Sequence, residues 1–312
     1  MRHESWLVYR DGDCDAAAGR FEALLAEVGD EAGELRGMVL IGLGVARLGQ
    51  GDGERAERAF RLALAIFDAR GDERRAAACY NNLGMVAHRQ GDVRGAARWY
   101  EQALRAHARR GDRSALAQAY NNLGSLYGDI GDYPRAAKYL EEAIRIRSRT
   151  GHAGLALACA NLGEVHLKQG RHAEARDHLE RAIALCEEGR GPGYLIPDAR
   201  RMLAELHLEC GAADEAAAAA RAALAWAEER GDRPRAGAAL RVLGEALAAL
   251  GDDAGAAARL AAAVEVLEAL ESPIELARVF AAQARHLERR GDPAAAALRA
   301  RAEALTAAVR GG

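Results

Sequence analysis

Five asparagines recur at matching places about 40 residues apart: Asn81, Asn82, Asn121, Asn122 and Asn161. An asparagine amide offers two donors and one acceptor, so it can hold the backbone of an extended peptide without reading its side chains. Asparagine is a mediocre helix former, so its recurrence within helical patterns indicates a purpose beyond helix formation. The alternative is hydrogen bonding between neighbouring structural units, and the two roles are compatible.

Two pairs of opposite charge lie further along the chain, Arg201 with Glu205 and Arg241 with Glu245. Each pair is four residues apart, which places both charges on one face of a helix. One interpretation is a charged patch that selects the side chains of a partner. The simpler interpretation, which we favour, is a set of local salt bridges worth a few tenths of a kcal/mol per pair.

The histidines and cysteines do not form a pattern typical of a metal site. His166, His172 and His178 are six residues apart and lie on both sides of an expected turn, so they do not share one helical face. The five cysteines contain no Cys-x-x-Cys pair, and their odd number suits a reducing compartment. We therefore expect no metal site.

Two glycine-rich stretches fall short of nucleotide-binding motifs. GRGPG at 189–193 follows no strand pattern and precedes no Gly-Lys-Ser/Thr, so it is interpreted as a loop. GLGVARLG at 42–49 fails the G-x-G-x-x-G pattern because Arg47 occupies the place of the last glycine. No local Ser-His-Asp or Cys-His arrangement occurs either, so we predict that the protein is not an enzyme and needs no cofactor.

Composition excludes several other classes of protein. The chain has 312 residues, of which 50% are hydrophobic but only 5% are aromatic, so any core is built mainly from alanine and leucine. A net charge of −3 argues against a nucleic-acid partner. Neither a signal-like N-terminus nor a membrane-spanning apolar stretch is present, so we expect a cytoplasmic protein with no membrane partner.

The elements that must position these residues are defined by an internal repeat. Glycine recurs at steps of 39 to 41 residues and alanine keeps the same register, at Gly51, Gly91, Gly131, Gly170, Gly211, Gly251 and Gly291 and at Ala56, Ala96, Ala136, Ala175, Ala216, Ala256 and Ala296. A second set of glycines lies about halfway between, at Gly71, Gly111, Gly151, Gly191 and Gly231. This pattern predicts units of two helices, each ended by a glycine with positive φ. The aspartate after many of these glycines is expected to cap the next helix.

The most regular unit is 119–151, in which Gly124 and Ala136 are expected where its two helices approach closely. We predict a single domain over 1–312, with a partial repeat at 1–30, six repeats over 31–270 and a divergent capping repeat at 271–312. Ala17 and Phe21 fit the second-helix pattern of the partial repeat. In the last unit, Gln283 and Glu303 replace an apolar and a small residue, which suits a surface that faces water.

The repeat resembles the tetratricopeptide repeat (TPR), whose motif combines Leu-Gly and a tyrosine in one helix with alanines and an aromatic or leucine in the next. The NNLG at 81–84 and 121–124 is similar to the longer-repeat branch, which includes Pins-type adaptors, kinesin light chains and sensor segments of bacterial regulators. The resemblance implies an all-α, right-handed superhelical solenoid of antiparallel helix pairs.

In that family, first-helix residues beside the Leu-Gly slot face a concave groove. This implies a groove lined by Asn81, Asn82, Met85, His88, Gln118, Asn121, Asn122, Ser125, Asn161, Glu164, Arg201, Glu205, Arg241 and Glu245. The leading functional hypothesis is a scaffold that holds a protein or peptide segment there. The alternatives are a ligand-sensing module of a bacterial signalling or transcription system, and self-association through the terminal repeats.

Overall fold

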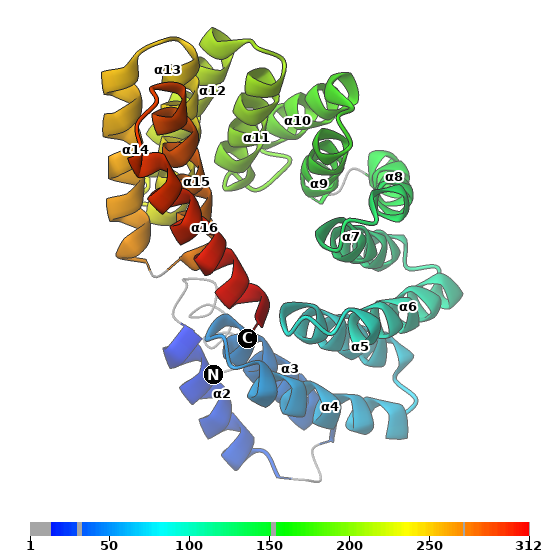
Figure 1. Ribbon diagram of the computed structural model, residues 1–312. Helices are drawn as coiled ribbons and strands as arrows, with labels where there is room; N and C mark the ends of the chain where they lie inside the picture. The colour runs from blue at the N-terminus through cyan, green and yellow to red at the C-terminus, as the bar shows by residue number, and fades with distance from the viewer. Residues whose placement is uncertain (1–13, 30–32, 151–153, 271, 312) are drawn as a thin grey trace. The chain divides into compact units, whose positions relative to one another are not determined.

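The computed structural model describes residues 14–29, 33–150, 154–270 and 272–311. These residues form helices and no strand, which confirms the all-α prediction (Figure 1). The helices are α2 (Cys14–Glu27), α3 (Gly33–Gly49), α4 (Gly53–Ala69), α5 (Glu73–Arg89), α6 (Val93–Arg110), α7 (Arg113–Asp129), α8 (Tyr133–Thr150), α9 (Leu155–Lys168), α10 (His172–Glu187), α11 (Leu195–Glu209), α12 (Ala213–Glu229), α13 (Arg233–Ala249), α14 (Asp253–Glu268), α15 (Pro273–Arg289) and α16 (Ala294–Gly311).

The helices pack in consecutive pairs, from α3 with α4 to α15 with α16, and each pair also packs against its neighbours within its own part of the chain. The chain divides into two compact units, which we call the N-terminal unit (Met1–His152) and the C-terminal unit (Ala153–Gly312). Each described unit is a stack of helical hairpins. The prediction of one domain over 1–312 stays a prediction. Among the described residues, no helix has the length and apolar character needed to cross a membrane.

The turns between helices depend on glycines in the left-handed region, as the repeat predicted. Every glycine of the first set has a positive φ, between 69° and 81°. In the second set Gly71, Gly111 and Gly231 do so too, whereas Gly151 lies outside the described residues.

The prediction for Gly191 is wrong. Gly189 makes the turn after α10 instead, with φ of 72°. A Cβ at Gly191 would lie 2.6 Å from the Ala156 Cβ and 2.8 Å from the Cys186 sulfur. The insertion after α10 therefore separates two glycine roles, the turn at Gly189 and close packing at Gly191.

Aspartate caps start many of the helices. The carboxylate of each accepts a hydrogen bond of 2.8–3.3 Å from the backbone amide three residues later, which satisfies a donor that the helix itself leaves free. The capping residues are Asp52, Asp72, Asp92, Asp112, Asp132, Asp232 and Asp252. The predicted caps are confirmed at these positions.

Small residues let the two helices of a unit approach closely. A Cβ on Gly124 would lie 2.5 Å from Leu140 Cγ and 3.3 Å from the carbonyl oxygen of Ala136, so only glycine fits without a shift. Ala136 itself is fully buried. The predicted close contact between Gly124 and Ala136 is confirmed, and Gly163 repeats it against Leu179 in the C-terminal unit.

The two ends of the repeat array differ in register. In α2, Ala17 and Phe21 are buried as the second-helix pattern predicted. In α16 the buried position no longer coincides with the recurring alanine, because Ala296 is exposed and Ala295 is buried in its place. The amide of Ala295 donates to Asp292 three residues back, whereas the equivalent Ala256 donates to Asp252 four residues back. This tighter first turn, after Pro293, moves the buried face by one residue.

Candidate functional site

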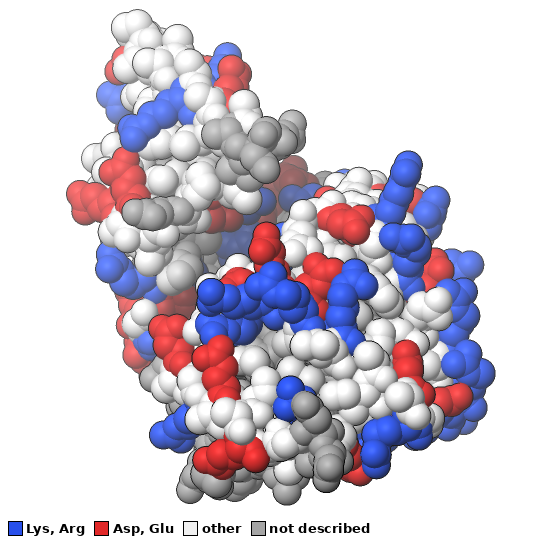
Figure 2. All heavy atoms as spheres, turned by 90° about the horizontal axis from the view of Figure 1, so that it is seen from below, with Lys and Arg blue, Asp and Glu red and all other residues white. Residues whose placement is uncertain are grey.

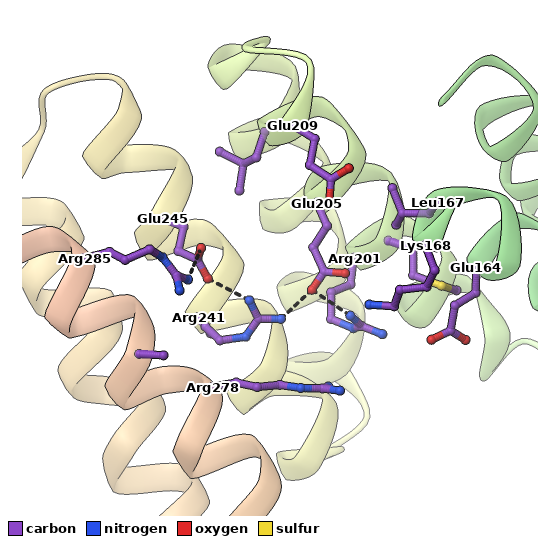
Figure 3. A pocket seen from close by; sticks show the side chains of 13 residues that line it. Glu164, Leu167, Lys168, Arg201, Glu205, Glu209, Arg241, Glu245, Arg278 and Arg285 are labelled. Atoms are coloured by element: carbon purple, nitrogen blue, oxygen red, sulfur yellow. Dashed lines mark hydrogen bonds and ion pairs between the residues drawn. The ribbon is translucent and has the colours of Figure 1, made fainter. Parts of the chain in front are cut away.

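The C-terminal unit contains a polar pocket with a cavity of about 340 Å³ (Figure 3). Its walls come from α9, α11, α13 and α15, the first helices of four consecutive hairpins. Five of the predicted groove residues line it: Glu164, Arg201, Glu205, Arg241 and Glu245. The 40-residue repeat therefore brings together residues from widely separated parts of the sequence.

Five of the lining residues form a chain of ion pairs across three helices, which we call the arginine–glutamate ladder: Arg201, Glu205, Arg241, Glu245 and Arg285. Arg201 Nη1 donates to Glu205 Oε1 at 2.9 Å, and Arg241 Nη2 donates to the same oxygen. Arg241 Nη1 donates to Glu245 Oε1 at 2.7 Å, and Arg285 Nη2 to Glu245 Oε2 at 2.9 Å. The two predicted i, i+4 pairs are present, and they are also joined to each other and to α15.

Burial and charge together define the centre of this ladder. The Arg241 side chain is only 8% exposed. Burial lowers the pKa of its guanidinium, but the carboxylates of Glu205 and Glu245 outweigh burial and hold that pKa above its ordinary value. For Glu205 the effect of burial has the opposite sign and raises the pKa of the carboxyl. The positive charges of Arg201 and Arg241 outweigh burial and hold this pKa below its ordinary value. Glu205 and Arg241 therefore each favour the charged form of the other.

Two further cations lie beside the ladder, Lys168 on α9 and Arg278 on α15, and Arg285 is the outermost member of the ladder itself. All three are exposed, so their heads reach solvent. Figure 3 shows the ends of Lys168, Arg201 and Arg278 pointing toward the same space, although they come from three different helices. The pocket can therefore offer several positive donors to one bound group.

On the face drawn in Figure 2, lysine and arginine gather in a row across the middle and along the right edge. Aspartate and glutamate lie beside these cations, which agrees with a net charge of only −3. What distinguishes the pocket is the concave arrangement of its charges rather than an excess of one sign.

Two of the asparagines that were predicted to hold a peptide form a hydrogen bond with each other in the N-terminal unit. Asn122 Nδ2 on α7 donates to Asn81 Oδ1 on α5 at 2.7 Å, and Gln118 Nε2 donates to Asn122 Oδ1 at 2.9 Å. Arg147 Nη2 completes the series by donating to Gln118 Oε1 at 2.9 Å. The alternative of hydrogen bonding between units is thus realised at Asn81 and Asn122.

The other predicted groove residues differ in burial. Asn121 is 4% exposed, so its amide is not offered to a partner at the surface. Asn82, Met85 and Ser125 are half-buried, and so is Asn161 in the C-terminal unit. His88 Nε2 lies 2.9 Å from an oxygen of Asp129 on the next first helix.

The sequence of the chain matches a known family over more than half of its length. The model of the family described as the MalT-like TPR region matches residues 5–202. The chain belongs to the MalT-like TPR family. No curated protein sequence matches it significantly. The resemblance to the tetratricopeptide repeat is therefore confirmed, and the helical hairpins are TPR units.

Several solved structures share the TPR architecture. Aspartyl phosphate phosphatase F from Bacillus subtilis has a TM-score of 0.73 at 18% identity, over 93% of this chain and 76% of that chain. The STAND protein of Pyrococcus horikoshii, which has a tetratricopeptide repeat sensor, gives 0.71 at 15% identity, over 93% and 44%. A Rap protein in complex with Competence and Sporulation Factor gives 0.66 at 18% identity, over 86% and 74%. At these identities the likeness shows the fold alone.

Sequence reasoning missed four charged residues of the pocket: Lys168, Glu209, Arg278 and Arg285. A signal for Arg285 was present, because it lies 40 residues after Glu245 and so occupies the equivalent place in the next TPR unit. It carries the opposite charge, which is why the ladder continues onto α15. Lys168 and Arg278 line the pocket because α9 and α15 form two of its walls, which the repeat pattern did not indicate for these positions.

His166 and His178 pack against each other between the two helices of one TPR unit. The rings of His166 on α9 and His178 on α10 stack with centroids 5.4 Å apart, and Tyr127 stacks on Tyr139 at the equivalent place in the preceding TPR unit. Burial, followed by the charges of His166 and Arg181, lowers the pKa of His178. Within the described ranges, no group of three or more His, Cys, Asp or Glu side chains is arranged to hold a metal ion.

Proposed function

We propose that this TPR protein is a non-enzymatic binding module that holds an extended segment of a protein or peptide. The observation that carries the proposal is the pocket that runs across the first helices α9, α11, α13 and α15. Its walls offer hydrogen-bond donors on arginine and lysine and acceptors on glutamate. A polypeptide backbone and polar side chains can bind to both kinds of group. The helical-repeat fold generally serves binding rather than catalysis.

The dimensions of the stack suit an extended chain. Packed helices lie about 8–10 Å apart, and an extended polypeptide advances about 3.3 Å per residue. One step between neighbouring first helices therefore corresponds to about three residues of a bound segment. Four first helices would accommodate a segment of roughly nine residues.

The polar residues of the N-terminal unit are proposed as a second contact surface. Asn82 and Ser125 are half-buried, which leaves part of each side chain for a partner. Asn81 accepts the hydrogen bond from Asn122 through its carbonyl oxygen, and within the described part of the chain its amide nitrogen donates to no other group. The Asn81–Asn122 pair would then both join two TPR units and present a donor to a peptide backbone.

The relatives support a binding or regulatory role in two ways. A Rap protein of similar fold was crystallised with Competence and Sporulation Factor, which is a precedent for holding a partner on this scaffold. The sensor of the STAND protein supports the second candidate, a ligand-sensing regulatory module. The ladder favours this candidate because it links α11, α13 and α15, so a ligand that competes for one ion pair would act on the packing of all three helices.

A pull-down from cell extract, read by mass spectrometry, tests the binding role. Wild type is compared with Lys168→Glu/Arg285→Glu, which reverses two exposed cations of the pocket. The matched control is Lys138→Glu/Arg176→Glu, which reverses two exposed cations outside it. Circular dichroism first establishes that all three are equally helical.

A partner captured by wild type and by the control, and lost from the pocket variant, is the expected result. Equal capture by all three chains would move binding away from the pocket, and capture of nothing would contradict the adaptor role. Small-angle scattering of the complex then separates a scaffold from a sensor, because only a sensor changes the radius of the protein on binding. A rise in mass with protein concentration would instead indicate self-association.

A further inference from the structure

We infer that the segment bound in the pocket presents a carboxylate to Lys168, Arg201 and Arg278, which we call the cation cluster. This inference rests on the proposed function and names the chemistry of the partner. The three side chains come from α9, α11 and α15, and Figure 3 shows them directed into one space beside the ladder. A bound carboxylate there would contact three TPR units at once.

The ion pairs of the pocket leave this cluster with positive charge to spare. Arg201 shares the single oxygen Glu205 Oε1 with Arg241, so this carboxylate serves two guanidinium groups. Arg278 pairs with Glu275, which does not line the pocket. Among the residues that the structure describes, Lys168 forms no ion pair, although its charge lowers the pKa of Glu205. Its ammonium group is therefore available to a ligand.

Of the acidic residues of the pocket, Glu205 pairs with Arg201 and its charge also acts on Lys168, whereas the other three are engaged elsewhere or directed away from the cluster. Glu209 lies 2.9 Å from His172 Nε2, and both oxygens of Glu245 are engaged by Arg241 and Arg285. Glu164 is four residues before Lys168, yet Figure 3 shows its carboxylate directed away from the lysine ammonium. A ligand carboxylate would thus meet three donors at this end of the pocket, in competition with Glu205 for Arg201 and Lys168.

Arginine favours a carboxylate for geometric reasons, because its planar fork matches the two oxygens and forms charge-assisted hydrogen bonds. Arg201 is 18% exposed and fixed by Glu205, so it supplies a preorganised donor. Arg278 is 52% exposed and Lys168 is exposed, so both are able to adjust to a ligand. Aspartate, glutamate and the free C-terminus of a peptide all supply the required group.

The test uses a phage-displayed library of random 12-residue peptides, selected on the full chain. A selected peptide is then labelled with fluorescein and made in three forms: as selected, with its acidic residue replaced by the corresponding amide, and with an amidated C-terminus. Fluorescence anisotropy measures the affinity of each form for wild type and for Lys168→Gln/Arg278→Gln. The control Lys138→Gln/Arg176→Gln removes two exposed charges elsewhere.

We expect wild type to select peptides with an acidic residue at one fixed place or a required free C-terminus. Removing that carboxylate should weaken binding roughly tenfold for wild type and for the control, the size expected for a charge-assisted bond. The same removal should weaken binding by a clearly smaller factor in Lys168→Gln/Arg278→Gln, because Arg201 is then the one member of the cluster left to contact the carboxylate. The two chemical modifications show whether a side chain or the terminus supplies the group.

Two outcomes overturn the inference and are distinguishable from each other. Selected peptides that bind the chain but tolerate loss of every carboxylate would leave the proposed peptide-binding function intact and refute the cation cluster. An equal loss in wild type and in Lys168→Gln/Arg278→Gln would do the same. Failure to select any peptide would contradict the proposed function itself.

Discussion

At the scale of single residues, Arg241 occupies the centre of the polar chemistry of the C-terminal unit. It bridges Glu205 on α11 and Glu245 on its own helix, and its side chain is more than nine-tenths buried. A buried charge is tolerated only when it is paired. Removing Arg241 would leave the carboxylates of Glu205 and Glu245 without this partner, which destabilises the folded state. Arg285 at the end of the ladder is 56% exposed and does not carry this penalty.

The first prediction concerns that asymmetry. Replacing Arg241 by alanine should lower the free energy of unfolding by about 2–4 kcal/mol, because Glu205 and Glu245 lose their shared partner inside the protein. The change Arg285→Ala should cost less than about 1 kcal/mol, since it removes an exposed pair. Urea unfolding followed by circular dichroism measures both. Equal losses would show that the ladder is an ordinary surface network.

The second prediction follows from the lowered pKa of Glu205. A carboxylate whose pKa is lower in the folded state stabilises the protein above its unfolded pKa, about 4.3, and loses that stabilisation as pH falls through the folded value. The melting temperature of wild type should therefore decrease more between pH 5 and pH 3 than that of Glu205→Gln. Parallel decreases in the two proteins would count against a perturbed Glu205.

At the scale of helices, the distance between the two helices of a hairpin depends on glycines at their closest contacts. Gly124 leaves no room for a Cβ beside Leu140, whereas Gly19 on α2 has nothing within 4 Å of the same added atom. Both glycines lie inside helices, where alanine is intrinsically preferred by up to about 1 kcal/mol. The same substitution should therefore have opposite signs at the two positions.

The third prediction uses this contrast. The change Gly124→Ala should destabilise the protein by about 1–3 kcal/mol through overpacking against Leu140 and the backbone of Ala136. Gly19→Ala should be neutral or stabilising because its added methyl group meets open space. Thermal unfolding of both variants provides the measurement. A stabilised Gly124→Ala protein would mean that α7 and α8 separate at little cost.

At the scale of the whole molecule, the contacts of a repeat protein are mostly local along the chain. Each helix packs against its hairpin partner and against the neighbouring hairpins of the N-terminal or C-terminal unit to which it belongs. The stability of such an array is approximately a sum over repeats and their nearest-neighbour interfaces. A local defect should therefore weaken the adjacent repeats more than distant ones.

The fourth prediction tests this locality. Leu243 on α13 is 2% exposed, and Leu243→Ala should cost about 2–4 kcal/mol locally. Hydrogen exchange read by mass spectrometry should show faster exchange in α11 to α15, with little change in α3 and α4 of the N-terminal unit. Uniformly faster exchange over the chain would indicate one cooperative unit instead.

Much of the fold was predictable from spacing, because repeat architecture is encoded locally. A glycine with positive φ, an aspartate cap and a small residue opposite a large one each depend on neighbours within a single hairpin. The wrong prediction at Gly191 and the change of register at Ala296 also have local causes. An insertion supplied two glycines for one turn, and the start of α16 after Pro293 shifted a helical face by one residue.

The sequence by itself determined the all-α repeat, its 40-residue period and the positions of most turns and caps. It also identified five charged or polar residues that line the pocket. Only the tertiary structure decided that Asn122 bonds to Asn81, that Asn121 is buried and that Arg241 joins two helices. It alone brought Lys168 and Arg278 to the same pocket. The reason is physical: helical periodicity specifies which face a residue occupies, but the packing of successive hairpins selects which side chains meet.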